Sequence, residues 1–89
     1  MSIKVTRVQL YDNGSGVKAF VDILFSEMIT VMNFKLLQGK KGLWVSMPQE
    51  PRNEEWFDLA KPYSKEVAEE IKKVVLQAYE TEKSKVGSV

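Results

Sequence analysis

The sequence has no cysteine and no histidine among its 89 residues. Without cysteine there is no disulfide framework, no thiolate metal site and no cysteine nucleophile. Without histidine the chain also lacks the usual zinc ligand and the commonest general base of enzymes. We therefore expect a protein that holds no metal and no cofactor and is not an enzyme.

The remaining candidates for catalysis are a few carboxylates and serines. Glu54, Glu55 and Asp58 lie close in the sequence, and paired carboxylates can do acid–base chemistry. A solvated loop explains the two glutamates better, and an aspartate just before a helix is usually a structural hydrogen-bond acceptor. Ser46 and Ser64 have no histidine to activate them as nucleophiles. The carboxylates and serines therefore do not change the expectation of a non-enzyme.

Long apolar runs and an excess of charge are also missing. No segment approaches the roughly 18 apolar residues that a membrane span requires, and the first ten residues do not have the pattern of a signal peptide. We expect a cytoplasmic protein without a membrane partner. The formal net charge is only +1, so any binding to nucleic acid must depend on local basic patches.

The length and the hydrophobic content of 44% are sufficient for one small domain over residues 1–89. We expect order over about residues 2–82 and a frayed polar tail over residues 83–89. A chain of this size completes its core more easily when an interface extends it, which favours a homo-oligomer.

The first half of the chain predicts two strands joined by a turn. The apolar positions of the first strand change parity, from Ile3 and Val5 to Val8 and Leu10, which indicates a bulge or twist near residues 6–7 unless the buried face is misassigned. The cluster at residues 12–16 (Asp-Asn-Gly-Ser-Gly) is typical of a hairpin turn. Residues 17–25 then alternate cleanly and form the clearest strand.

A third strand follows a two-residue connection at Ser26 and Glu27. Residues 28–37 are apolar on both parities, a pattern that is typical of a strand buried on both faces. We expect a helix to cover one face and a partner chain to cover the other, with Ile29 and Val31 at the dimer interface. The alternative is a central strand with a few exposed apolar residues.

The segment from Gly39 to Pro48 predicts a tight turn and a short fourth strand. Gly39 and Gly42 bracket two lysines, and glycine adopts turn conformations without steric cost. Pro48 ends the strand because it cannot donate a backbone hydrogen bond. We expect a polar loop over residues 49–55, after which the aromatic pair at residues 56–57 re-enters the fold. Trp44 and Trp56 could stack on nucleic-acid bases, but core packing is the favoured interpretation for each.

The last element is a helix that begins just after Pro62, because proline is not tolerated inside a helix. Ser64 is the expected N-cap. An apolar stripe of about three turns follows the helical period; it consists of Val67, Ile71, Val74, Val75 and Ala78. The predicted fold is therefore α+β, a four-stranded antiparallel meander with one C-terminal helix.

The basic residues that could contact nucleic acid occur in three parts of the chain. Lys35, Lys40 and Lys41 have no acidic residue between them, and such a turn either aids solubility or contacts phosphates. The lysines after residue 60 are nearly balanced by glutamates, which favours an ordinary solvated helix face. Around Arg52 the segment 49–55 is net acidic.

Two motifs resemble the SpoVG family (stage V sporulation protein G). The first is Phe34-x-Leu36-x-x-Gly39-x-x-Gly42-Leu43-Trp44-Val45-Ser46-Met47-Pro48, and the second is Asp58-Leu59-Ala60-Lys61-Pro62 before a helix that ends near Tyr79. The resemblance extends from Ile3 to about Glu80. It implies a small cytoplasmic bacterial protein, homodimeric through its sheet, that affects septation, sporulation and gene expression, and whose relatives in several cases bind DNA or RNA.

The resemblance also implies positions for nucleic-acid contacts, after the Met-Pro pair and near the helix. The family's Ser-Lys-Arg after Met-Pro is Gln49, Glu50 and Pro51 here, followed by Arg52. The family's histidine before the second proline is Lys61, its helix contacts include Lys65, and a common helix arginine is Ala68.

Two functions are consistent with these observations. In the first, a homodimer binds DNA or RNA through phosphate contacts. The expected contact residues are Arg52, Lys61, Lys65, Lys72, Lys73, Lys40 and Lys41. In the second, the protein is an interaction module in cell division, its partners are septation proteins, and its charges only face solvent.

Overall fold

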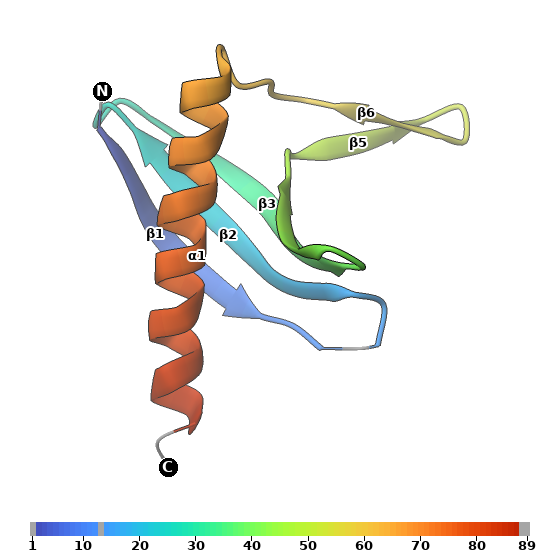
Figure 1. Cartoon of the computed structure of the whole chain (residues 1–89). Coiled ribbons are helices and arrows are strands. Elements are labelled where there is room, and N and C mark those ends of the chain that lie inside the picture. The colour runs from blue at the N-terminus through green and yellow to red at the C-terminus, as the bar shows by residue number, and fades with distance from the viewer. Residues whose placement is uncertain (1, 13, 88–89) are drawn as a thin grey trace.

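The computed structural model describes residues 2–12 and 14–87, which form a four-stranded sheet, a two-stranded sheet and one helix (Figure 1). The larger sheet has the antiparallel order β1-β2-β3-β4, so the predicted α+β meander with a C-terminal helix is confirmed. Asn13 of the first predicted turn and residues 88–89 of the predicted tail lie outside the described residues. The elements are β1 (Ile3–Leu10), β2 (Val17–Phe25), β3 (Ile29–Gly39), β4 (Gly42–Ser46), β5 (Gln49–Arg52), β6 (Glu55–Asp58) and α1 (Lys65–Gly87).

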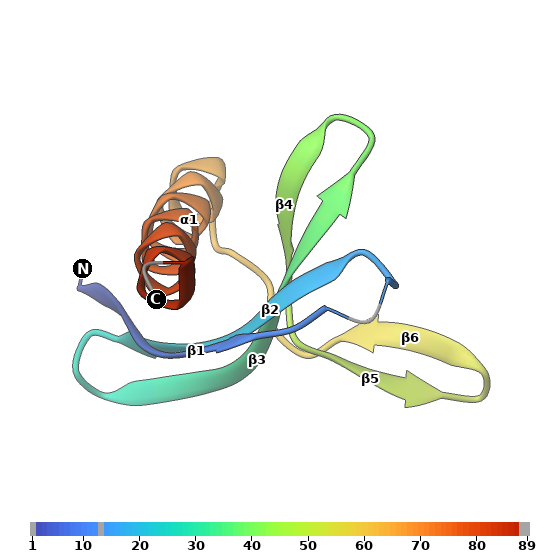
Figure 2. The same ribbon diagram turned by 90° about the horizontal axis from the view of Figure 1, so that it is seen from below.

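Helix α1 lies across one face of the four-stranded sheet, and the core fills the space between them (Figures 1 and 2). The sheet contributes alternating apolar side chains from β2 and β3, and the helix contributes its apolar stripe, extended by Tyr79. Full burial of one such aliphatic or aromatic side chain contributes about 1.5–3 kcal/mol. The buried core consists of Ala19, Val21, Ile23, Phe34, Leu36, Ile71, Val75 and Tyr79.

The start of the helix agrees with the prediction. The Ser64 hydroxyl accepts a hydrogen bond from the backbone N–H of Val67 at 3.2 Å, which makes Ser64 the N-cap. The helix continues to Gly87 and so includes residues 83–87 of the predicted tail, whose fraying in solution stays a prediction. In the described part of the chain no helix combines the length and the apolar content that a membrane crossing requires.

Two bulges shift the strand register at the same level of the sheet. On β1 the pairing passes from Val5–Ile23 to Arg7–Asp22, which leaves Thr6 as the extra residue and confirms the predicted bulge. On β3 the pairing passes from Val31–Ile23 to Phe34–Val21. Val31 and Phe34 therefore both face the helix although their parities differ. The bulge thus explains why apolar residues occupy both parities of β3, and the cover of its second face by a partner chain stays a prediction.

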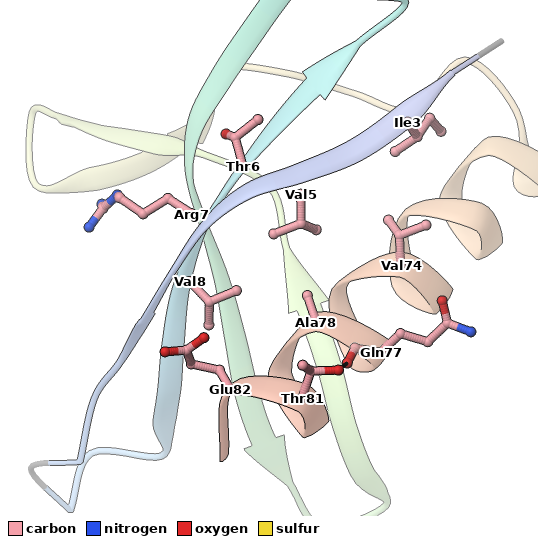
Figure 3. A pocket seen from close by; sticks show the side chains of 10 residues that line it. All are labelled: Ile3, Val5, Thr6, Arg7, Val8, Val74, Gln77, Ala78, Thr81 and Glu82. Atoms are coloured by element: carbon pink, nitrogen blue, oxygen red, sulfur yellow. Dashed lines mark hydrogen bonds between the residues drawn. The ribbon is translucent and has the colours of Figure 1, made fainter. Parts of the chain in front are cut away.

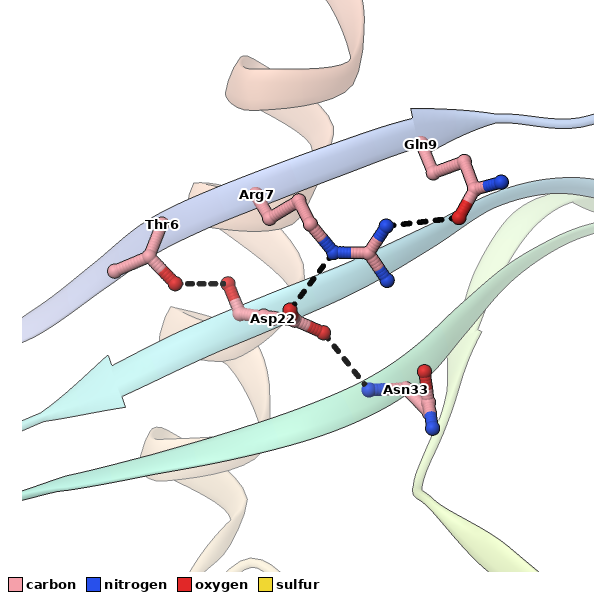
Figure 4. Close-up of polar contacts among 5 residues, drawn as sticks. All are labelled: Thr6, Arg7, Gln9, Asp22 and Asn33. Atoms are coloured by element: carbon pink, nitrogen blue, oxygen red, sulfur yellow. Dashed lines mark hydrogen bonds and ion pairs between the residues drawn. The ribbon is translucent and has the colours of Figure 1, made fainter.

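Asp22 lies between the two bulges and serves both of them (Figure 4). Its carboxylate accepts hydrogen bonds from Arg7 Nε at 2.9 Å and from the backbone N–H of Asn33 at 3.1 Å. Its carbonyl oxygen accepts from Thr6 Oγ1 at 3.4 Å. Asn33 has a φ of 67°, so its amide has left the regular ladder and needs this acceptor. The Asp22 side chain is buried, and it accepts hydrogen bonds from groups that the bulges would otherwise leave without a partner.

The segment that was expected to be a polar loop is a hairpin instead. Strands β5 and β6 pair with each other, and the turn residues Asn53 and Glu54 have φ values of 49° and 69°, as in a type I′ turn. The hairpin projects from the body of the molecule as an arm (Figures 1 and 2). Trp56 and Phe57 do not re-enter the core, because they lie on β6 with 60% and 42% of their surfaces exposed.

Candidate nucleic-acid interface

All seven predicted contact residues are exposed, but they belong to separate parts of the molecule. Lys40 and Lys41 form the turn between β3 and β4, and Arg52 ends β5 at the tip of the arm. Lys61 lies in the connection from β6 to the helix, and the other three are helical. The helix therefore offers the largest group, and the geometry of its faces decides which lysines act together.

Three lysines of α1 form a line along one side of the helix. Lys72 and Lys83 follow Lys65 by seven and eighteen residues, which is about two and five helical turns and a total length of about 27 Å. We call Lys65, Lys72 and Lys83 the lysine row. Lys83 was not among the predicted contacts, although its eighteen-residue spacing from Lys65 was visible in the sequence.

The lysine row lies outside the cleft that α1 forms with residues 3–8 of β1. A shallow cleft of about 430 Å³ separates β1 from α1, and its helical lining includes Gln77, Thr81 and Glu82 but no lysine (Figure 3). Lys83 lines a different cleft of about 410 Å³, together with Leu43 of β4 and Leu10 at the end of β1. Because the row follows the helix axis, its other two lysines point to the same side. The Lys40–Lys41 turn closes the β3–β4 hairpin and lies on that side too.

Lys73 is on the outward face of α1, where acidic residues surround it. Positions three, four and seven residues away are its neighbours on the helix surface. Four of these six positions are acidic (Glu70, Glu69, Glu66 and Glu80), and the other two are Leu76 and Gln77. The outward face is therefore net acidic, and the solvated interpretation fits Lys73 better than a phosphate contact does.

Arg52 and Lys61 do not join the lysine row. The Arg52 guanidinium forms an ion pair with Glu50 and lies 5.6 Å from the ring centre of Phe57. Lys61 precedes the helix and lines a mostly apolar cleft of about 230 Å³ with Pro62 and Tyr63. Arg52 belongs to the arm, and Lys61 belongs to the connection between the arm and α1. Neither lies on the helix face that carries the lysine row.

The two tryptophans are not core residues, so the favoured interpretation of core packing is wrong for both. Trp44 is 50% exposed and Trp56 is 60% exposed. Trp44 pairs with Leu37 across the β3–β4 ladder, and Lys35 pairs with Ser46 two rows further along. These residues point to the face of the sheet that α1 leaves uncovered, which we call the open face.

The two residues expected at a dimer interface differ in their surroundings. Val31 packs against the core of its own chain, because it faces the helix. Ile29 is 62% exposed at the end of β3 and pairs with Phe25, which lines the apolar cleft near the start of α1. Ile29 therefore extends an apolar surface that begins in that cleft.

The carboxylates near the arm have structural positions. Asp58 Oδ1 accepts a hydrogen bond from Gln49 Nε2 at 2.7 Å and so joins the ends of β5 and β6, as its predicted acceptor role requires. Glu54 lies in the turn of the arm and Glu55 begins β6. Over the residues that the structure describes, no three metal-binding side chains come together.

Comparison with known proteins gives one consistent result. The SpoVG family model matches residues 1–81. Three relatives carry the name "Putative septation protein SpoVG". The Archaeoglobus fulgidus protein is 38% identical over 86% of this chain and 94% of its own length. The Bdellovibrio bacteriovorus protein is 34% identical over 96% and 81%, and the Treponema denticola protein is 33% identical over 90% and 87%.

Proposed function

The chain belongs to the SpoVG family, and on that premise we propose that it is a nucleic-acid-binding regulator that acts as a homodimer. Its phosphate contacts are the lysine row of α1 and the Lys40–Lys41 turn. The processes that it affects are septation, sporulation and gene expression. The observation that carries the proposal is the alignment of Lys65, Lys72 and Lys83 along one side of α1, outside the cleft that the helix forms with residues 3–8 of β1.

The lysine row suits a polyanion because the rest of the chain supplies little net charge. With a formal charge of +1, the protein attracts phosphates only where cations are concentrated. A double helix carries one negative charge for about every 1.7 Å of its axis, so a row about 27 Å long meets many phosphates. A dimer presents two rows. Contacts of this kind give weak sequence preference and steep salt dependence.

The test is the salt dependence of binding to mixed-sequence duplex DNA and to RNA. The variant replaces Lys65, Lys72 and Lys83 with glutamine, and a control replaces Lys4, Lys73 and Lys85, so that both lose the same charge. We expect the slope of log K against log salt to fall by about 0.9 for each lost contact to duplex DNA. The control should keep the wild-type slope. Equal losses in both variants, or no wild-type binding at low salt, would contradict the proposal.

The homodimer is proposed to form on the apolar surface around Ile29. Ile29→Asp places a charge there without entering the core, and it should give a folded monomer on analytical ultracentrifugation. Thr30→Asp, the next residue on the opposite side of the strand, is the control and should remain dimeric. Val31→Asp is not diagnostic, because it places a charge against the core of its own chain. A stable dimer of Ile29→Asp would exclude this interface.

A second function is an interaction module in septation that does not bind nucleic acid appreciably. The arm favours it, because Trp56 and Phe57 are exposed there while Arg52 is engaged by Glu50. The names of the relatives refer to septation as well. Absence of binding to both DNA and RNA at low salt would favour this function.

A further inference from the structure

We propose that the open face carries a stacking site for unpaired nucleobases, formed by Trp44, Lys35 and Trp56. The inference rests on the proposed function, because it assumes a nucleic-acid partner. It goes beyond that function by naming single-stranded segments as the ligand and aromatic stacking as the contact. Neither the lysine row nor the Lys40–Lys41 turn distinguishes single strands from duplexes, since both contact only phosphates.

The three residues lie in one region of the open face. Lys35 and Trp44 occupy rows of the β3–β4 ladder that are two residues, or about 7 Å, apart along the strands and point to the same face. Both line a cleft of about 360 Å³. Trp56 reaches this region from the arm, and its ring centre is 5.2 Å from Lys35 Nζ. Lys35 thus shares a cleft with the indole of the sheet and contacts the indole of the arm.

Both indoles are held in place although each is half exposed or more. A Cβ atom at Gly39 would lie 3.2 Å from Trp44 Nε1 and 3.3 Å from Cδ1, so the ring of Trp44 rests against a glycine that has no side chain to displace it. Trp56 is oriented by the Lys35 ammonium group over its ring. Aromatic side chains that are fixed before binding lose less entropy when a ligand stacks on them.

The chemistry of the site fits a nucleobase with its phosphate. An exposed indole offers a flat apolar surface for stacking, and a neighbouring lysine contacts the backbone phosphate. The cleft also contains one carboxylate, Asp58, which would repel phosphate, but its Oδ1 is engaged by Gln49 at 2.7 Å. Bases of a duplex are already stacked on one another, so only unpaired bases can reach these rings.

Fluorescence tests the inference because the chain has only two tryptophans. Trp44→Phe leaves Trp56 as the only indole, and Trp56→Phe leaves Trp44, while phenylalanine keeps a stacking surface. We expect a short oligothymidine to quench the emission of each variant, and a duplex of equal length to leave it unchanged. Trp44→Leu should weaken oligothymidine binding by about tenfold and leave duplex binding unchanged. Circular dichroism confirms folding; should Trp44→Leu not fold, the quenching of the two phenylalanine variants decides.

Each other outcome has a distinct meaning. Binding of both ligands without quenching would overturn the stacking site and leave the proposed function intact. Binding of neither ligand would overturn the proposed function and the stacking site with it. A shift of tryptophan emission on dilution of the protein alone, with no quenching by oligothymidine, would show that a second copy covers the open face, and would also overturn the inference.

Discussion

The two faces of the four-stranded sheet are built from the same strands but differ in burial and in polar content. The face under α1 is apolar, and its central side chains are fully buried. The open face carries the Arg7–Asp22 ion pair, Lys35 and the half-exposed ring of Trp44. Because successive residues of a strand point to opposite sides, one set of strands supplies a stabilising face and a second face that α1 leaves uncovered.

The two bulges beside Asp22 keep this division intact in the middle of the sheet. Each bulge moves the helix-facing set from one parity to the other, on β1 between Val5 and Val8 and on β3 between Val31 and Phe34. Asp22 satisfies the groups that the bulges release. The difference between the faces therefore depends on a buried polar group as well as on the apolar core, and the following changes test each part.

The largest effect is expected on the covered face. Phe34→Ala removes a fully buried ring and should lower the free energy of unfolding by about 3–5 kcal/mol. Met32→Ala, in the exposed bulge of the same strand, should change it by no more than about 0.5 kcal/mol. Urea denaturation measures both. Comparable losses would mean that the two sides of β3 do not differ as described.

The next effect is expected at the bulges. Asp22→Ala leaves the Asn33 N–H without its acceptor and should cost about 1–3 kcal/mol of unfolding free energy. Asp22→Asn keeps an oxygen acceptor and should cost less. Urea denaturation gives the two values, and hydrogen exchange at the Asn33 amide should be faster in the alanine variant. Unchanged exchange there would remove the role assigned to Asp22.

A smaller effect is expected at the start of the helix. Ser64→Ala removes the acceptor for the Val67 N–H and should lower the free energy of unfolding by about 1 kcal/mol. Ser64→Asp keeps a capping oxygen and serves as the control in the same thermal denaturation series. If the two variants are equally destabilised, the side-chain oxygen is not what caps α1.

The smallest effect on stability is expected at Gly39. A substitution there therefore tests the orientation of Trp44 on the open face without unfolding the protein. Gly39→Ala should change the free energy of unfolding by less than about 1 kcal/mol, because only the ring of Trp44 must move. The emission of Trp44 in a Trp56→Phe background should nevertheless change. Gln38→Ala, at the neighbouring exposed position, is the control. An unchanged spectrum would mean that Gly39 does not orient the indole.

Much of the fold could be predicted from local signals. Pro62 and Ser64 marked the start of α1, and the parity change of β1 revealed its bulge. The same signal in β3 was interpreted as burial on two faces, because apolar side chains also occupy the exposed positions 28 and 32. The arm was missed because Asn53-Glu54 lacks the glycine that usually marks a type I′ turn.

The candidate site was less predictable, because it depends on how elements meet. The lysine row follows from helical spacing, but the side of α1 that it faces depends on how the helix lies on the sheet. The exposure of Trp44 depends on which face of the sheet α1 covers. The exposure of Trp56 depends on the β5–β6 hairpin, which the sequence did not predict. The pairing of Arg52 with Glu50 likewise needs the extended backbone of β5, which places the two side chains on one side of the strand.

The most direct test of the division between the two faces is a ¹⁵N-correlated NMR titration with an oligonucleotide. Shifts are predicted for the amides along the lysine row, for the Lys40–Lys41 turn and for the indole N–H signals of Trp44 and Trp56. Amides that line the cleft between β1 and α1, such as those of Gln77 and Thr81, should not shift. Shifts confined to that cleft, or none at all, would contradict the account.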